Sequence, residues 1–301
     1  MVNRIGTLCL VIGGFICAAW LVGVVCSDRW VWSQWLSWLP VITLLPGIAL
    51  LTAGRVLRGT TLNPALGGLC FVAVVGLQVL TLWRPASTIE ADTLRIVHWT
   101  AGPGVSDAHA VQQVIEDGNA DVFIALGTTV RDWGDLLEWG AIPGPIRRAE
   151  FTILSRYPVL TCRSLARVEN IQLVLLELDV NREPMTILLL DLPSELTCSR
   201  MAIAHKARSL IETRLDTAPD LVIGDFNMTQ HSAALKKIMP GWQAAWNEGG
   251  RGWGGTWPPQ LPLWRIDHVL VPKDATPPAI TTVWAGQGRH RTQLIDVVID
   301  E

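Results

Sequence analysis

Three long apolar stretches without charged residues occupy the first third of the chain. The first runs from Ile5 to Ser27, and the other two lie between Arg29 and Arg55 and between Arg58 and Arg84. About 20 helical residues cross a hydrocarbon core of about 30 Å. The pattern therefore predicts a membrane domain over residues 1–84 with three transmembrane helices, at about 5–27, 33–54 and 62–83.

The arginines beside these stretches predict their orientation. Arg4, Arg55 and Arg58 fall on one side of the predicted membrane, and Arg29 and Arg84 fall on the other. Because basic residues favour the cytoplasmic side, we expect a cytoplasmic N-terminus. Three spans then place the rest of the chain outside the cytoplasm, as the C-terminal domain of a multi-pass protein of the cell membrane.

Two features of the apolar region have alternative interpretations. The first stretch is longer than the apolar core of a typical secretory signal peptide, which favours a retained helix over a cleaved leader. Tryptophans gather at the outer ends of the predicted spans, where an aromatic belt would lie, although they are also compatible with an apolar loop. These are Trp30, Trp32, Trp35, Trp38 and Trp83.

The pattern changes after Pro85. Residues 85–92 are polar and predict a tether, and residues 93–301 carry short β-rich runs and two segments of helical periodicity, Asp107–Asp117 and Arg200–Leu215. Mixed strands and helices predict an α/β layered domain. The β-rich runs are Leu94–Trp99, Val122–Leu126, Phe151–Ser155, Leu173–Leu178, Thr186–Leu190, Leu221–Ile223, Ile266–Val271, Ile280–Trp284 and Asp296–Ile299.

Composition narrows the function classes. The chain has 301 residues, of which 50% are hydrophobic and 17% charged, and its net charge is −3. No basic surplus is available to follow a nucleic-acid backbone, so we expect the lipid bilayer as a partner and no nucleic acid. The six cysteines lack metal-type spacing, and whether Cys162 and Cys198 pair is left open.

Polar residues that can perform chemistry follow a buried-strand pattern at Leu221–Ile223. Gly224, Asp225 and Asn227 come directly after it. A carboxylate and an amide at a strand end can hold a water molecule beside a phosphate oxygen. Taken alone, Asp225 and Asn227 are also compatible with a simple turn.

Two further clusters lie near the C-terminus. Asp267 follows Arg265 at the start of a predicted strand, and His290 stands between Arg289 and Arg291 before the last strand. Each has a structural alternative, because Asp267 could pair with Arg265 and His290 could be a surface histidine. Their order together with Asp225 and Asn227 is more specific than any one of them.

With these motifs, residues from Leu94 onward resemble the endonuclease/exonuclease/phosphatase superfamily. The resemblance is carried by Ile153–Pro158, Gly224–Asn227, Arg265–Asp267 and His290. It implies a four-layer α/β/β/α sandwich, here preceded by the three predicted spans. The whole arrangement is also similar to bacterial membrane phosphatases of the glycopeptide-resistance type, which are thought to act on lipid-linked pyrophosphates outside the cytoplasm.

The resemblance implies roles for the four matching residues. Asp225 would be the general base, Asn227 would hydrogen-bond the transition state, His290 would polarise the phosphate, and Asp267 would orient the imidazole. Four other family positions have changed: Thr100 replaces an asparagine, Thr128 a metal-binding glutamate, Asp191 a phosphate-facing histidine, and Arg289 a metal-binding aspartate.

These changes bear on the divalent metal, such as Mg²⁺, that the resemblance implies. Thr128 and Arg289 remove both family carboxylate ligands. A cation about 4 Å from the metal would repel each unit charge by about 4 kcal/mol at an effective dielectric constant of about 20. Asp191, Asp225 and Asp267 could gather a displaced metal, or Arg289 could bind phosphate directly, with Asp191 and Thr100 beside it.

Two functions follow from this set of residues. The first is a membrane-anchored phosphoester hydrolase that acts on a lipid-linked or small phosphoester. The second is a pseudoenzyme that keeps the fold and binds a phosphate ligand or a protein partner. Retention of Asp225, Asn227, Asp267 and His290 favours the first function, whereas Thr128 and Arg289 favour the second. A DNA-repair nuclease is excluded by the predicted membrane anchor and by the lack of a basic groove.

Overall fold

The protein divides into two compact units in a computed structural model that describes residues 1–60, 64–85 and 92–299. The first unit contains Met1–Leu82 together with Leu196–Ala202 and His231–Ala234. The second contains the remainder of the chain from Trp83. Most of the predicted tether, residues 86–91, lies outside the described residues.

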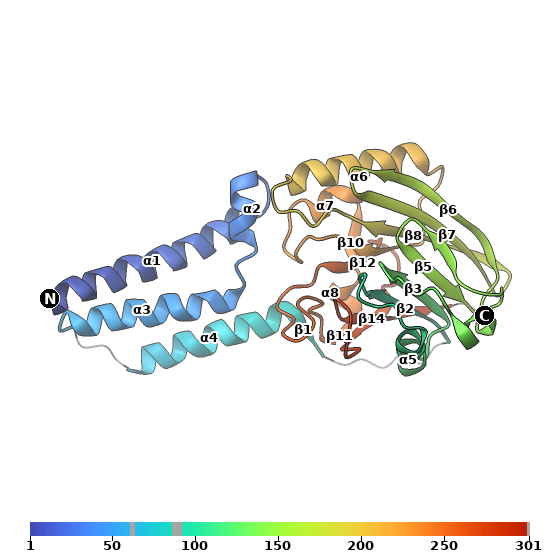
Figure 1. Ribbon diagram of the computed structural model, residues 1–301. Coiled ribbons are helices and arrows are strands. Elements are labelled where there is room, and N and C mark those ends of the chain that lie inside the picture. Colours follow the sequence, from blue (N-terminus) through green and yellow to red (C-terminus); the bar gives the residue numbers. More distant parts are fainter. Residues whose placement is uncertain (61–63, 86–91, 300–301) are drawn as a thin grey trace. The chain divides into compact units, whose positions relative to one another are not determined.

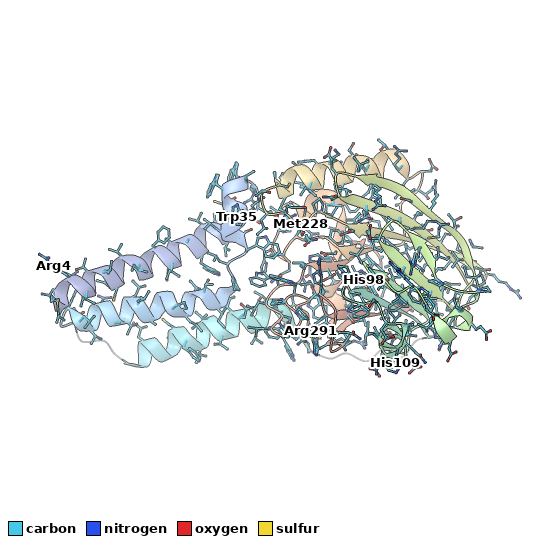
Figure 2. The ribbon with its side chains drawn as sticks, in the orientation of Figure 1. Arg4, Trp35, His98, His109, Met228 and Arg291 are labelled. Atoms are coloured by element: carbon cyan, nitrogen blue, oxygen red, sulfur yellow. The ribbon has the colours of Figure 1, made fainter. Side chains whose placement is uncertain are left out.

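The N-terminal helices of the first unit are drawn in blue to cyan in Figure 1. They are α1 (Val2–Cys26), α2 (Val31–Ser37), a 3-10 turn (Val41–Thr43), α3 (Leu44–Leu57) and α4 (Pro64–Leu82). Figure 2 shows Arg4 near the start of α1, at the end remote from the turn into α2.

One helix, α1, has 25 residues and is apolar enough to span a membrane. The second predicted segment, 33–54, is not one helix, because α2 meets the segment Val41–Leu57 at a bend of 82°. Pro40 lies at this break, and proline both lacks a backbone N–H and disfavours helical geometry in the residue before it. The apolar part of α4, Leu66–Leu82, is shorter than α1.

Helices α1 and α3 pack through glycines. A Cβ atom at Gly13 would lie 2.7 Å from the carbonyl oxygen of Gly47, and one at Gly54 would lie 2.7 Å from that of Gly6. Small residues let two helix backbones approach closely, which is a common basis of helix association in lipid. Gly14, the neighbour of Gly13, has no atom within 4 Å of a Cβ placed there.

The second unit is built on two β-sheets. The eight-stranded sheet has the order β1-β11-β13-β14-β2-β3-β5-β4, and the six-stranded sheet has the order β10-β12-β9-β8-β7-β6. The strands are β1 (Trp83–Arg84), β2 (Thr93–Thr100), β3 (Val122–Leu126), β4 (Ile146–Arg148), β5 (Phe151–Ser155), β6 (Val159–Val168), β7 (Ile171–Val180), β8 (Glu183–Asp191), β9 (Leu221–Asp225), β10 (Trp242–Ala244), β11 (Gly250–Trp253), β12 (Asp267–Pro272), β13 (Ala279–Val283) and β14 (Thr292–Val298).

Apolar side chains from both sheets form the core between them, including Ile124, Val174 and Ile223. Helix α5 (Ala108–Gly118) packs Val111 and Ile115 on the outer face of the eight-stranded sheet, and α6 (Arg200–Arg214) runs along the six-stranded sheet (Figure 1). The remaining helical pieces are short: η2 (Gly134–Glu138), α7 (Leu235–Ile238) and α8 (Trp246–Gly249). The α/β sandwich predicted from the sequence is confirmed.

All nine predicted β-rich runs coincide with strands, and the two predicted helices coincide with α5 and α6. Strands β1, β4, β6, β10 and β11 were not predicted. The longest of them, β6, has a burial pattern that mixes exposed residues with half-buried ones and lacks a regular alternation. The sequence left the pairing of Cys162 and Cys198 open, and the structure has both as free thiols.

We predict that Gly13→Val separates α1 from α3, because the added side chain would overlap the backbone of Gly47. The matched control is Gly14→Val, which places the same side chain one position away in open space. Thermal unfolding of the full chain in detergent should show a clear loss of stability for Gly13→Val alone. Equal losses for both variants would contradict the packing described for this helix pair.

Candidate active site

Three aspartates lie side by side where strands of the six-stranded sheet meet. Asp191 is the register partner of Asp225 across β8 and β9, and Asp225 is the partner of Asp267 across β9 and β12. Gly224 makes this close pairing possible, since a Cβ atom there would lie 1.8 Å from the carbonyl oxygen of Leu190. The sequence thus places three carboxylates in adjacent strands at one edge.

Asp267 is the centre of a buried hydrogen-bond chain. Its Oδ2 lies 2.8 Å from Nδ1 of His290, and its Oδ1 accepts a hydrogen bond of 2.7 Å from the Thr100 hydroxyl. The backbone N–H of His290 donates to the carbonyl of Thr100, at 3.1 Å. His290 is therefore held at both its backbone and its ring. The predicted Asp267–His290 pair is present, and the alternative, an ion pair of Asp267 with Arg265, is not found among the described residues.

A second carboxylate acts on the same imidazole. Oδ2 of Asp225 lies 3.8 Å from Nδ1 of His290. Burial alone would lower the pKa of His290, but the negative charges of Asp267 and Asp225 raise it to about 9. Burial would likewise raise the pKa of Asp267, yet the neighbouring imidazole holds it below its usual range. At neutral pH the pair is an imidazolium and a carboxylate, with the Nε2 side of the ring left for a ligand.

The pKa of Asp191 is shifted in the opposite direction from that of Asp267. Its burial and the nearby charge of Asp225 raise its pKa to about 8, although a hydrogen bond from Gln172 opposes the shift. The amide nitrogen of Gln172 donates to Oδ2 of Asp191 at 2.7 Å. Asp191 is therefore a neutral carboxylic acid at pH 7. In that form it can donate a hydrogen bond to a phosphate oxygen, and it is a poor ligand for a metal.

The backbone of Asn227 is hydrogen-bonded to the carboxylate of Asp225, two residues earlier in the chain. Its backbone adopts φ 49°, and its N–H donates to Oδ1 of Asp225 at 2.9 Å. Its side-chain amide donates to the carbonyl of Leu192 at 2.8 Å. Asparagine adopts this left-handed conformation more readily than most residues. One amide hydrogen is used by Leu192, and the second is available for a ligand.

Thr128 and Arg289, the positions expected to have lost metal-binding carboxylates, lie beside two strands that flank β2: Thr128 follows β3, and Arg289 precedes β14. The Thr128 hydroxyl pairs with that of Thr152 at 2.9 Å, so it belongs to a neutral hydrogen bond. Arg289 is exposed, and its side chain lies against Gly102, where an added Cβ would come within 2.7 Å of it. Neither residue provides a carboxylate for a cation.

Three of the remaining donors lie together. Within the described ranges, one group of three such residues is close enough to hold an ion, with the ligand atoms of Asp225, Asp267 and His290 within 4.8 Å of one another. Both oxygens of Asp267 already accept hydrogen bonds, one from Thr100 and one from His290. A divalent ion bound by this group would have to replace these hydrogen bonds, so the donor set as it stands fits Mg²⁺ poorly.

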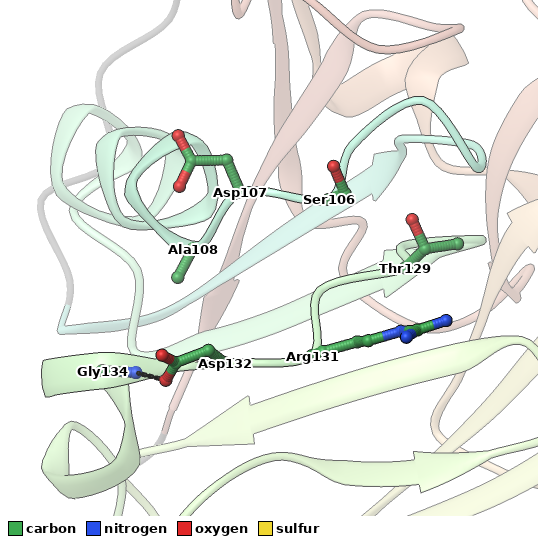
Figure 3. Close-up of a pocket in the computed structure, with 7 residues that line it drawn as sticks. All are labelled: Ser106, Asp107, Ala108, Thr129, Arg131, Asp132 and Gly134. Atoms are coloured by element: carbon green, nitrogen blue, oxygen red, sulfur yellow. Dashed lines mark hydrogen bonds between the residues drawn. The ribbon is translucent and has the colours of Figure 1, made fainter.

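A polar pocket of about 600 Å³ lies beside the end of β3 (Figure 3). One wall is the loop before α5, with Ser106 and Asp107, and the other is the loop after β3, with Thr129, Arg131 and Asp132. The hydrogen bond from the N–H of Gly134 to Asp132, 3.1 Å long, closes the second loop. No sequence motif pointed to this pocket.

One residue that supports the site was not predicted. Gln172 in β7 donates a hydrogen bond to Asp191 in β8. Only the strand register reveals this contact, because glutamine in a strand carries no signal of its own. Thr256, which stands in a motif shortly before Asp267, accepts the backbone N–H of Asp267 through its hydroxyl oxygen.

A family model, described as the endonuclease/exonuclease/phosphatase family, matches residues 101–291. The chain belongs to the endonuclease/exonuclease/phosphatase family. Members of this family generally use divalent metals. A search of curated proteins found no significant match.

Solved structures support the fold. Truncated TDP2 from Caenorhabditis elegans has a TM-score of 0.53 and 14% identity, over 69% of this chain and 98% of that one. An endonuclease/exonuclease/phosphatase protein from Bacteroides vulgatus has a TM-score of 0.52 and 14% identity, over 69% and 100%. A humanized TDP2 from D. rerio has a TM-score of 0.51 and 15% identity, over 68% and 98%.

We predict that Asp267→Asn lowers the pKa of His290, because the variant removes the closest negative charge from a buried ring. A raised pKa contributes stability that is fully present below pH 6.5 and is lost as the pH rises through about 9. Histidine NMR should measure the titration of the His290 ring, and unfolding experiments at different pH values should measure the stability. Asp216→Asn, at an exposed position, is the control. An unchanged His290 titration in Asp267→Asn would refute the pairing.

Proposed function

We propose that this family member is a membrane-anchored phosphoester hydrolase that binds phosphate through protein cations in place of the family metal. The observation that carries the proposal is the buried chain Thr100–Asp267–His290 beside Asp225. This chain fixes the protonated ring of His290 through Nδ1, and the Nε2 atom of the ring can face a phosphate. Arg289 supplies a guanidinium close in sequence, and such a group suits phosphate oxygens.

The proposed reaction assigns one task to each side chain. Asp225 accepts a proton from water as the water oxygen forms a bond to phosphorus and the ester bond breaks. His290 stabilises the charge on the phosphate oxygens and gives a proton to the leaving oxygen. Asn227 donates its second amide hydrogen to the transition state. Asp267 keeps the ring oriented, and neutral Asp191 adds a hydrogen bond without adding repulsion.

A lipid substrate is supported by a tryptophan-rich loop after β11. Trp83, which directly follows α4, is the register partner of Trp253 in β11. The following loop packs Trp257 against Trp264, with ring centroids 5.2 Å apart, and leaves Leu261 64% exposed. Tryptophan is typical of membrane interfaces.

The same loop reaches the site through Thr256, which bonds the N–H of Asp267. We therefore propose a phosphorylated lipid as the substrate class, in keeping with the resemblance to glycopeptide-resistance phosphatases. The multi-pass topology with the C-terminal domain outside the cytoplasm is part of this proposal. Helix α1, which is long and apolar enough for a membrane span, supports anchoring.

The second candidate is a pseudoenzyme that binds phosphate without turnover. Thr128 favours it, because its hydroxyl pairs with Thr152 at the position where the family carries a metal-binding glutamate. Without a metal, the leaving group and the attacking water depend on His290 and Asp225 alone. The two candidates share a binding site and differ only in whether phosphate is released.

We predict that the full chain in lipid nanodiscs releases inorganic phosphate from phosphatidic acid in the presence of EDTA. Asp225→Asn should lower the rate by 10²-fold or more, because a general base typically contributes about 10²–10⁴-fold. Asp216→Asn, the same change at an exposed position outside the site, is the matched control. Soluble p-nitrophenyl phosphate serves as the small-phosphoester substrate.

Two outcomes would count against metal-free hydrolysis. Activity that EDTA abolishes and Mg²⁺ restores would contradict metal-free chemistry. Phosphate binding with no release from either ester would support the pseudoenzyme. In that case Thr128→Glu with Arg289→Asp should create Mg²⁺-dependent turnover, and by more than the two single changes combined, since ligands of one ion act together.

A further inference from the structure

Residues 27–34, which comprise the turn after α1 and the first part of α2, carry two polar side chains that are almost wholly buried. Asp28 is 3% exposed and Gln34 is 0% exposed. Burying a carboxylate or an amide is unfavourable unless it is hydrogen-bonded. In both cases the partners come from segments about 160 to 200 positions later in the chain, and those segments belong to the same unit.

Asp28 binds the segment His231–Ala234. Its Oδ1 accepts the backbone N–H groups of Ala233 and Ala234, at 2.8 and 3.1 Å, and its Oδ2 accepts the hydroxyl of Ser232. Ser27 adds a hydrogen bond from its hydroxyl to the carbonyl of His231, at 3.1 Å. A carboxylate with two backbone amides and a hydroxyl is a charge-assisted arrangement, which is stronger than neutral hydrogen bonds.

Gln34 binds the other segment, Leu196–Ala202. Its amide nitrogen donates to the carbonyls of Leu196 and Cys198, the latter at 3.1 Å. Its amide oxygen accepts the N–H of Arg200, at 3.1 Å. Both donors and the acceptor of the side chain are therefore used, so a residue of another shape could not replace it without leaving buried backbone groups unpaired.

The two bound segments are the connections that follow the strands of the site. Leu196–Ala202 comes a few residues after Asp191 at the end of β8 and leads into α6. His231–Ala234 comes a few residues after Asp225 and Asn227 and leads into α7. Residues 27–34 thus bind both connections, through Asp28 in the turn after α1 and Gln34 in α2.

We propose that residues 27–34 are a docking site for these two connections, with Asp28 in the turn after α1 and Gln34 in α2 as the positioning residues. If α1 spans the membrane, the docking site holds both connections on the side of the membrane where α1 ends. The inference goes beyond the proposed hydrolysis and does not depend on it, because it concerns how the chain is held whether or not phosphate is released.

Hydrogen–deuterium exchange of the full chain in nanodiscs tests the proposal with two crossed variants. Asp28→Ala should speed exchange about tenfold or more in the peptide covering 231–234, because the N–H groups of Ala233 and Ala234 lose their acceptor. Gln34→Ala should do the same in the peptide covering 196–202, through the N–H of Arg200. Each variant is the control for the other, and Asp216→Ala is the neutral control.

Selective loss of protection, each variant in its own segment, is the expected result. Exchange that stays at the level of Asp216→Ala in both segments would overturn the proposal. Faster exchange throughout β7, β8 and β9 in either variant would also overturn it, because the effect would then be general destabilisation. Asp28→Asn gives a further check: it keeps an acceptor oxygen and should fall between wild type and Asp28→Ala.

Discussion

The buried ion pair between Asp267 and His290 is the interaction on which the rest of the site depends. An isolated buried imidazolium would lose its proton, and an isolated buried carboxylate would gain one. Together, with Asp225 nearby, they keep opposite charges at neutral pH. The pair fixes the ring and places a cation at the strand ends.

The backbone makes this pair possible. Adjacent strands place Asp191, Asp225 and Asp267 in register, and Gly224 allows the close approach of β8 and β9. Three carboxylates so close cannot all be charged without strong repulsion. The neutral state of Asp191 and the protonated ring of His290 relieve that repulsion. The arrangement is suited to an anion with several oxygens, as in a phosphate group.

The order of motifs predicted the fold and most of the site, because strand ends in this family carry their chemistry at recognisable points. Asp225, Asp267 and His290 converge as expected. The state of Asp191 could not be predicted, since it depends on Gln172 from another strand. The length of the apolar stretch alone also could not distinguish a helix broken at Pro40 from one continuous span. The contacts of Asp28 and Gln34 join residues too distant in sequence for any local pattern to reveal.

The central claim is that phosphate binds here through protein cations and needs no metal. Isothermal titration of the full chain with inorganic phosphate, in EDTA and then with Mg²⁺, tests it most directly. The account predicts binding in EDTA that weakens as the pH rises through about 9, when His290 loses its proton, and that is lost in His290→Gln. Binding that appears only with Mg²⁺, or that is unchanged in His290→Gln, would contradict the account.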